Sequence, residues 1–184
     1  MGGGALEGLF VAYVGGIRSG KSALAHRRFA EELPKRGLRS PVYLGTLLED
    51  ATAQDVQLTQ RVQSHRAARP EAWATLAVAQ DLPGTAQRCL LAGHDAWLLD
   101  GLGAWGALNL DQAGDAMIAL EAFLTLARSV PLVVVVLDEV GQGGIAGHAA
   151  ARAFADLNGL FNQTVCGEAD EAWSVQAGLA LRLK

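Results

Sequence analysis

Short apolar runs alternate with longer amphipathic stretches along this chain of 184 residues. The apolar runs predict strands at residues 10–14, 42–44, 96–99, 132–137, 171–175 and 179–183, and the amphipathic stretches predict helices at 21–35, 51–67, 84–92, 111–128 and 149–166. A short turn-forming segment, 176–178, separates the last two strands and indicates a C-terminal hairpin. The alternation is typical of βαβ units, so we expect an α/β fold with a mainly parallel sheet flanked by helices.

The residues that follow the first predicted strand match the phosphate-binding loop pattern G-x-x-x-x-G-K-[ST]. They are Gly15, Gly16, Ile17, Arg18, Ser19, Gly20, Lys21 and Ser22. In this pattern the glycines let backbone N–H groups turn toward the phosphates, the lysine spans the outer phosphates, and the serine hydroxyl coordinates magnesium. The helix predicted to begin at Lys21 directs its positive N-terminal end at the same anion. A chance glycine-rich turn would not need this setting, so we expect a nucleoside triphosphate site.

A magnesium ion at such a loop needs a carboxylate at the end of a nearby strand, and the chain offers two. Asp100 ends the apolar run that starts at Ala96, and Asp138 ends the longer run that starts at Val133. On pattern alone the second is the better match to a Walker B strand. Either acid could instead cap the turn or helix that follows it. Spacing does not choose between them.

Composition limits the class of partner. The formal net charge of −4 argues against broad binding to nucleic acid or to anionic membranes, so a small molecule is the expected partner.

The length suits one domain, which we expect to span residues 1–184. No stretch resembles a membrane span or a secretory signal, which predicts a cytoplasmic protein. Cys89 and Cys166 form no C-x-x-C pair and suggest neither a metal site nor a disulfide.

One histidine lies in a distinctive segment. His65 is surrounded by Arg61, Arg66 and Arg69 near the end of a predicted helix. Neighbouring cations disfavour the imidazolium and leave a neutral nitrogen that could attack phosphorus. The alternative is a solvated basic helix end whose histidine packs or caps. The other three histidines are assigned to the surface or to packing, and are His26, His94 and His148.

Several motifs follow one another at specific spacings. The loop at 15–22 is followed by Tyr-Leu-Gly-Thr at 43–46, Arg-Val-x-x-His-Arg-x-x-Arg-Pro-x-x-Trp at 61–73, Leu-Leu-Asp at 98–100, and further motifs at 139–143, 152–163 and 169–171. Together they resemble the bifunctional adenosylcobinamide kinase / adenosylcobinamide-phosphate guanylyltransferase family of cobalamin biosynthesis. The resemblance runs nearly end to end, and it implies a RecA-like P-loop fold whose members can assemble as trimers.

The resemblance also implies an activity. The family phosphorylates the aminopropanol hydroxyl of adenosylcobinamide, then transfers GMP from GTP to that phosphate through a histidine–GMP intermediate, giving adenosylcobinamide-GDP. It implies GTP and ATP as substrates, Mg²⁺ as cofactor and a corrinoid as the acceptor. By the same resemblance His65 is the nucleophile and Lys21 is also catalytic. Beyond the loop, the implied nucleotide contacts are Thr46, Arg66, Arg69 and Asp100, and the implied magnesium ligands are Ser22 and Asp100.

The sequence departs from the family pattern at a few positions. Ala77 replaces a usual Glu, Gly103 stands where Thr is common, and Ala155 replaces the Arg of Phe-Arg-Asp. Asp138 occupies a position where the family often has Asn. These departures bear on base preference, corrinoid contacts and the balance of the two activities.

Two other hypotheses remain open on the sequence. One is a P-loop small-molecule kinase without guanylyltransferase activity, in which His65 only binds. The other is a nucleotide-dependent binding or assembly protein. The His65-Arg66-x-x-Arg69-Pro70 block favours the bifunctional enzyme, because neither alternative requires it.

Overall fold

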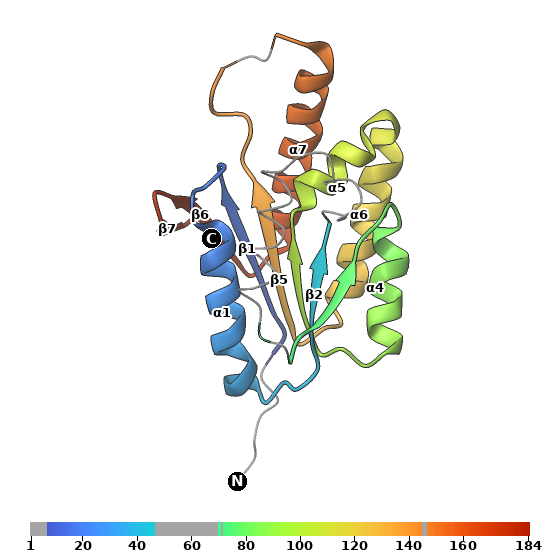
Figure 1. Ribbon diagram of the computed structural model, residues 1–184, viewed down its shortest axis with the longest axis vertical. Helices are drawn as coiled ribbons and strands as arrows, with labels where there is room; N and C mark the ends of the chain where they lie inside the picture. The colour runs from blue at the N-terminus through green and yellow to red at the C-terminus, as the bar shows by residue number, and fades with distance from the viewer. Residues whose placement is uncertain (1–6, 47–69, 71, 145–146) are drawn as a thin grey trace.

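The structure, a computed structural model, describes residues 7–46, 70, 72–144 and 147–184. These residues form a seven-stranded sheet with the strand order β3-β2-β4-β5-β1-β6-β7. The strands are β1 (Leu9–Gly15), β2 (Pro41–Gly45), β3 (Ala74–Ala77), β4 (Ala96–Asp100), β5 (Leu132–Asp138), β6 (Glu171–Gln176) and β7 (Leu179–Arg182). All neighbouring pairs are parallel except β6 and β7. The carboxyl ends of the parallel strands therefore meet at one edge of the sheet, the top edge in Figure 1.

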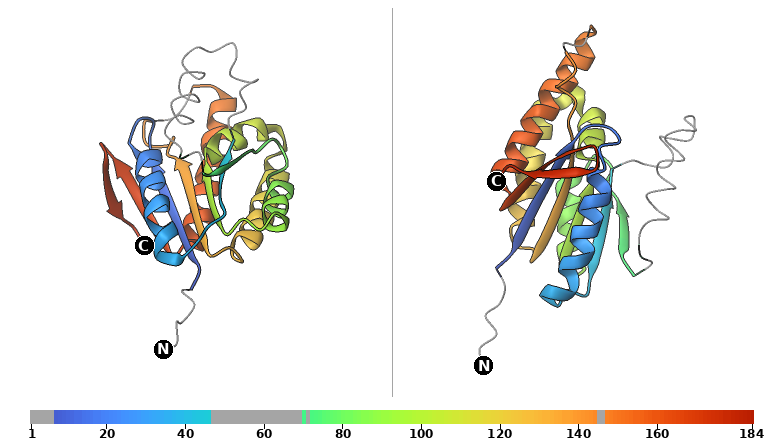
Figure 2. Two further views of the ribbon diagram at one scale, coloured as in Figure 1. Left: turned by 60° about the horizontal axis from the view of Figure 1, so that its bottom comes forward. Right: turned by 90° about the vertical axis from the view of Figure 1, so that its left-hand side faces the viewer.

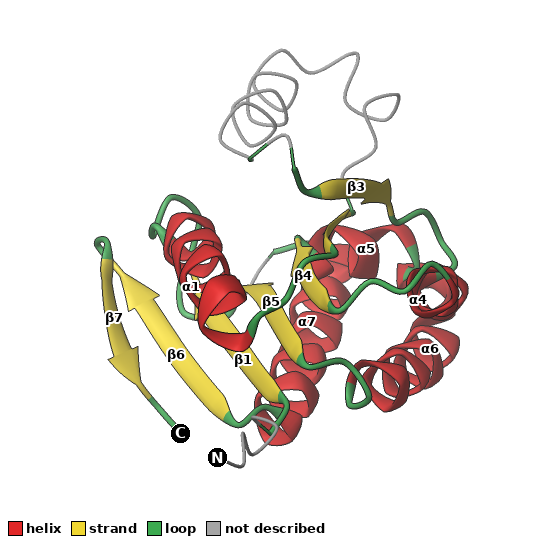
Figure 3. Ribbon diagram, turned by 90° about the horizontal axis from the view of Figure 1, so that it is seen from below, coloured by secondary structure: helices red, strands yellow, loops and turns green. Residues whose placement is uncertain are grey.

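Helices cover both faces of the sheet. They are α1 (Lys21–Arg36), α4 (Leu82–Leu91), α5 (Leu102–Leu108), the 3₁₀ turn η1 (Leu110–Gln112), α6 (Ala113–Ala127) and α7 (Ala149–Glu168). Figure 3 shows α1 on one face and α4, α5, α6 and α7 on the other. In the described part of the chain, no helix has the length and apolar character needed to cross a bilayer.

The two faces bury separate apolar clusters, because successive residues of a strand point to opposite sides. Along β1, Phe10 and Ala12 pack under α4 to α7, whereas Val11 packs under α1. On α1 the buried Ala25 and Phe29 are four residues apart and face the sheet. Strands buried on both faces appear in the sequence as nearly continuous apolar runs, which is why β1 and β5 were predictable.

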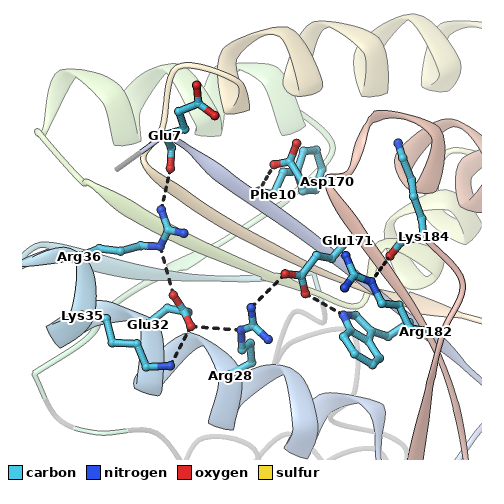
Figure 4. Close-up of polar contacts among 11 residues, drawn as sticks. Glu7, Phe10, Arg28, Glu32, Lys35, Arg36, Asp170, Glu171, Arg182 and Lys184 are labelled. Carbon is cyan, nitrogen blue, oxygen red and sulfur yellow. Dashed lines mark hydrogen bonds and ion pairs between the residues drawn. The ribbon is translucent and has the colours of Figure 1, made fainter. Parts of the chain in front are cut away.

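The C-terminal hairpin lies at the sheet edge beside β1 and α1 (Figure 2, left). Polar contacts join α1 to β6 (Figure 4): the Arg28 guanidinium pairs with Glu171 at 3.1 Å and with Glu32 at 3.3 Å. Glu32 also pairs with Lys35 and Arg36. These contacts connect the outer side of α1 to the hairpin.

All six predicted strands and the C-terminal hairpin are confirmed. Four predicted helices are found within a few residues of their expected bounds, and the helix predicted at 51–67 lies outside the described residues. The predicted helix at 111–128 begins as the 3₁₀ turn η1. Two elements were missed. The strand β3 is only four residues long. The short α5 is capped by Gly101 and contains Gly103 and Gly106, and glycine disfavours helix.

Candidate nucleotide-binding site

The loop between β1 and α1 has the backbone shape that a phosphate cradle requires. Arg18 and Gly20 have left-handed backbones, with φ of 56° and 95°. Gly15 has no space for a side chain, because a Cβ there would lie 2.5 Å from Ser19 Oγ and 2.6 Å from the Val175 carbonyl oxygen. The predicted strand–loop–helix arrangement is therefore present, with α1 starting at Lys21.

The turn of the C-terminal hairpin supports this loop from outside. The Gly178 N–H donates to the Ser19 carbonyl at 2.8 Å, and a Cβ on Gly20 would lie 3.2 Å from Gly178 Cα. The hairpin was predictable from the sequence but this contact was not, because no local pattern pairs two glycine-containing turns so distant along the chain.

Lys21 is 4% exposed and has two partners for its ammonium group. Its Nζ donates to the Gly16 carbonyl at 3.1 Å and pairs with Asp138 Oδ1 at 2.9 Å. Asp138 ends β5, directly opposite Gly15 in the register of β1 and β5. Of the two strand-end acids, Asp138 is therefore the one that meets the loop lysine.

Asp100 makes a different set of contacts. It ends β4, is 8% exposed, and accepts hydrogen bonds from Ser22 Oγ at 3.3 Å and from Tyr43 Oη at 3.2 Å. The strand β5 lies between β1 and β4, yet the first turn of α1 leans far enough across the sheet for Ser22 to reach Asp100. The loop hydroxyl and a strand-end carboxylate thus meet at the N-terminus of α1.

Ser22 and Asp100 present the kind of oxygen donors that Mg²⁺ prefers. Among the described residues, no group of three or more His, Cys, Asp or Glu side chains could hold a metal ion. A magnesium ion at Ser22 and Asp100 would therefore take its remaining ligands from phosphate and water, which is common for this ion. The donor set fits a magnesium ion that arrives with a nucleotide.

Thr46 follows β2 at the same edge and is 1% exposed. Its hydroxyl bonds the Gly101 carbonyl and lies 3.3 Å from the Asp100 carbonyl. This contact ties the end of β2 to the turn after Asp100. A direct contact between Thr46 and a nucleotide stays a prediction.

His26 was predicted to lie at the surface or in packing, and the structure places it beside Asp100. It packs against Tyr43 and Trp73, with ring centroids 5.5 Å and 6.0 Å away, but its Nε2 also lies 3.6 Å from Asp100 Oδ2. The available signal was its spacing, since a residue four positions after Ser22 shares that face of the helix. His26 belongs to the surroundings of Asp100 and is not an isolated packing residue.

Three predicted site residues, His65, Arg66 and Arg69, lie outside the described residues. The described residues on either side of that segment lie at different levels of the sheet. Thr46 contacts the turn after Asp100, and Trp73 packs beside His26. Thr46 therefore lies at the carboxyl edge beside Asp100, whereas Trp73 precedes β3 near the amino end of the sheet, level with the start of β2.

Two of the departures from the family pattern lie at the same edge of the sheet. Ala77 ends β3, and Gly103 lies in the first turn of α5. A Cβ on Gly103 would come within 2.9 Å of both Asn158 Oδ1 and Asp138 Oδ2, so the bare backbone lets α5 approach Asp138 closely. Gly103 thus bears directly on the position of the Asp138 carboxylate.

The fold and this loop define a P-loop protein of the RecA-like class. Solved structures with the same fold include the flagellar accessory protein FlaH from Methanocaldococcus jannaschii, with a TM-score of 0.54 and 15% identity over 100% of this chain and 81% of that one. Another is the KaiC-like protein PH0186 from Pyrococcus horikoshii OT3, with a TM-score of 0.52 and 13% identity over 99% of this chain and 81% of that one. At these identities the likeness is one of fold alone.

Sequence comparison identifies the family. Residues 11–183 match the family described as cobinamide kinase / cobinamide phosphate guanyltransferase. The bifunctional adenosylcobalamin biosynthesis protein CobU of Salmonella typhimurium is 30% identical over 195 residues, covering 96% of this chain and 100% of that protein. The Pseudomonas aeruginosa protein CobP is 32% identical over 178 residues, covering 93% and 95%. The chain belongs to this family, which confirms the resemblance and the expectation of an enzyme of the kinase and nucleotidyltransferase classes.

Proposed function

We propose that this protein phosphorylates adenosylcobinamide and then transfers GMP from GTP to adenosylcobinamide phosphate through a histidine–GMP intermediate, giving adenosylcobinamide-GDP. Family membership over nearly the whole chain supports the two activities. The observation that carries the proposal into this structure is the meeting of Ser22 and Asp100, 3.3 Å apart, beside the buried Lys21.

In the kinase step, the hydroxyl of adenosylcobinamide attacks the γ-phosphorus of a nucleoside triphosphate. The bond from that phosphorus to the β,γ-bridging oxygen breaks, and the hydroxyl proton is released. Lys21 and the loop N–H groups stabilise the charge on the departing nucleoside diphosphate. Magnesium, when bound by Ser22 and Asp100, neutralises phosphate charge.

In the transfer step, a neutral nitrogen of His65 attacks the α-phosphorus of GTP, and pyrophosphate leaves. The phosphate of adenosylcobinamide phosphate then attacks the same phosphorus, which releases the histidine and forms the diphosphate bond of the product. The covalent intermediate lets one nucleotide site serve two steps. The assignment of His65 is supported by family membership over residues 11–183 and by Thr46, which bonds the Gly101 carbonyl beside Asp100 just before the His65 segment begins.

The same proposal includes the remaining predicted features. The loop residues 15–22 with Thr46, Arg66, Arg69 and Asp100 bind the nucleotide, and both GTP and ATP are substrates. One domain spanning residues 1–184 carries both activities, and the protein works in the cytoplasm as a homotrimer. For the oligomer, the direct test is analytical ultracentrifugation.

The experiment that tests this function is intact-protein mass spectrometry after incubation with magnesium and GTP, without a corrinoid. The expected result is a GMP adduct on the parent chain and none on His65→Ala. A second incubation adds adenosylcobinamide phosphate, which should discharge the adduct. No adduct in a parent chain that binds GTP would point to a kinase or a nucleotide-dependent binding protein, and phosphorylation of adenosylcobinamide would separate these two.

A further inference from the structure

The carboxylate of Asp138 has no role in the chemistry above, yet it occupies the phosphate end of the site. Its Oδ1 is 2.9 Å from Nζ of Lys21, and its side chain is 30% exposed. Its backbone carbonyl accepts hydrogen bonds from the side-chain amides of Asn158 at 2.6 Å and Asn162 at 3.0 Å. The end of β5 is therefore fixed from α7, and the carboxylate is fixed opposite the loop lysine.

The lysine cannot serve Asp138 and a triphosphate equally. Lys21 is buried, so its charge needs an anionic or strongly polar partner at all times. In this structure that partner is Asp138, with the Gly16 carbonyl in support. A P-loop lysine reaches the outer phosphates when a nucleotide binds. Phosphate oxygens must then replace or share the place that Asp138 occupies.

Sharing brings two negative groups together. A triphosphate whose outer phosphates lie at Lys21 also lies beside the Asp138 carboxylate, and like charges at such short range repel in a partly buried site. Magnesium on the phosphates lowers their charge and so lowers this repulsion. The repulsion is therefore largest for a nucleotide without magnesium.

We propose that Asp138 is a positioning residue for Lys21: it holds the ammonium group at the loop while no nucleotide is bound, and it makes nucleotide binding depend on magnesium by disfavouring the metal-free triphosphate. This inference rests only on the nucleotide-binding part of the function proposed above. It does not depend on the histidine intermediate or on the corrinoid.

The test measures the dissociation constant of one probe with magnesium and with EDTA. The probe is GTP with a methylene group between the α- and β-phosphorus atoms, which cannot form a GMP adduct by loss of pyrophosphate. No corrinoid is added. For Asp138→Asn, whose amide oxygen can still accept from Lys21, we expect the metal-free dissociation constant to fall about tenfold. With magnesium we expect the dissociation constant to fall only about twofold to threefold. The ratio of the metal-free to the magnesium-bound dissociation constant therefore shrinks.

The matched control is Glu139→Gln, which removes one negative charge from the next residue. Glu139 accepts from the Gly141 N–H at 3.0 Å, so its carboxylate belongs to the following turn and not to Lys21. This variant should keep the parent protein's ratio of metal-free to magnesium-bound dissociation constants. Asp138→Ala removes the contact with Lys21 altogether and should shrink the ratio as Asp138→Asn does. With two variants, the test still gives an answer if one of them fails to fold.

An unchanged ratio in both Asp138 variants, or weaker metal-free binding in both, would overturn the inference. Failure of the proposed function looks different. A parent chain that binds the probe but forms no GMP adduct from GTP would refute the guanylyltransferase and leave the magnesium ratio as informative as before.

Discussion

Asp100 and Asp138 end buried parallel strands at the same edge of the sheet, but their surroundings differ. Asp100 is 8% exposed and accepts hydrogen bonds from Ser22 and Tyr43. Asp138 is more open, at 30% exposed, and faces Lys21. Each acid meets a different residue of one loop because β5 lies directly beside β1, whereas β4 is one strand further away. A strand-end acid is therefore defined by its place in the sheet more than by the run of residues before it.

This difference separates the two acids, which the sequence pattern alone did not. The Val-rich run before Asp138 is the better Walker B match, but the geometry that suits a magnesium ligand, a carboxylate beside the loop hydroxyl, belongs to Asp100. In our proposal the two acids act oppositely: Asp100 favours the metal-bound nucleotide through coordination, and Asp138 disfavours the metal-free nucleotide through repulsion.

Lys21 is the point where the two acids are connected, and its removal should have the largest effect. We expect Lys21→Ala to lower both phosphorylation of adenosylcobinamide and GMP adduct formation by at least about a hundredfold, because both need the triphosphate in place. Assays of both activities measure this. Lys35→Ala, a change at an exposed lysine on the same helix, is the control and should change neither. Retention of either activity in Lys21→Ala would refute the shared site.

Asp100→Asn should separate the acids most clearly. We expect about a 10- to 100-fold loss of magnesium-dependent binding of the methylene GTP analogue, while metal-free binding changes little. Asp138→Asn should do the reverse and mainly strengthen metal-free binding. Titration of both variants with magnesium at fixed analogue concentration measures the difference. Similar responses from the two variants would remove the distinction between them.

Tyr43→Phe tests whether the hydrogen bonds to Asp100 matter. Losing the hydroxyl removes one bond to Oδ2, so we expect a loss of about 1 kcal/mol, seen as an approximately fivefold higher magnesium requirement. Tyr13→Phe is the control, because Tyr13 is also a buried tyrosine on the α1 face but lies on β1, two strands away from the strand β4 that ends at Asp100. A shift of equal size in both variants would indicate general loosening of the core.

The sequence predicted those parts of the site that depend on neighbours in the chain. The loop residues 15–22 and the following helix are one continuous segment, so their pattern carried their structure. The contact between His26 and Asp100, and that between Gly178 and Ser19, join segments that only the strand order brings together. Strand order follows from packing of the whole sheet, and no local pattern contains it.

The same limit applies to the elements that were missed. The strand β3 is short and alternates between half-buried and exposed residues, so without its partner β2 its sequence resembles a loop. The choice of Asp100 over Asp138 came from the family resemblance and not from spacing. The helix predicted at 51–67 and the roles of His65, Arg66 and Arg69 stay predictions, since they lie outside the described residues.

A third carboxylate, Glu32, lies on α1 away from both acids and should affect stability but not nucleotide binding. It is 7% exposed and surrounded by Arg28, Lys35 and Arg36 (Figure 4). Burial alone would raise the pKa of Glu32, but hydrogen bonds from Lys35 and Arg36 and the charge of Arg28 outweigh it and hold that pKa below its ordinary value. A folded-state pKa below the unfolded one means that the stabilisation is present above the unfolded pKa and is lost as the pH falls through the folded pKa.

Glu32→Gln should therefore have the smallest effect of the set on nucleotide binding, namely none, while it lowers the unfolding free energy by about 1 kcal/mol at neutral pH, a loss that should vanish in acid. Urea unfolding at neutral pH and at several acidic pH values measures it, with the exposed neighbour Glu31→Gln as control. The ratio of the metal-free to the magnesium-bound dissociation constant should stay at the parent value. Within the described residues, the ion pairs of Glu32 are with Arg28, Lys35 and Arg36, whereas Lys21 pairs with Asp138. A changed ratio would mean that α1 transmits strain from its outer end to the loop. The carboxylate–lysine pair would then not act alone.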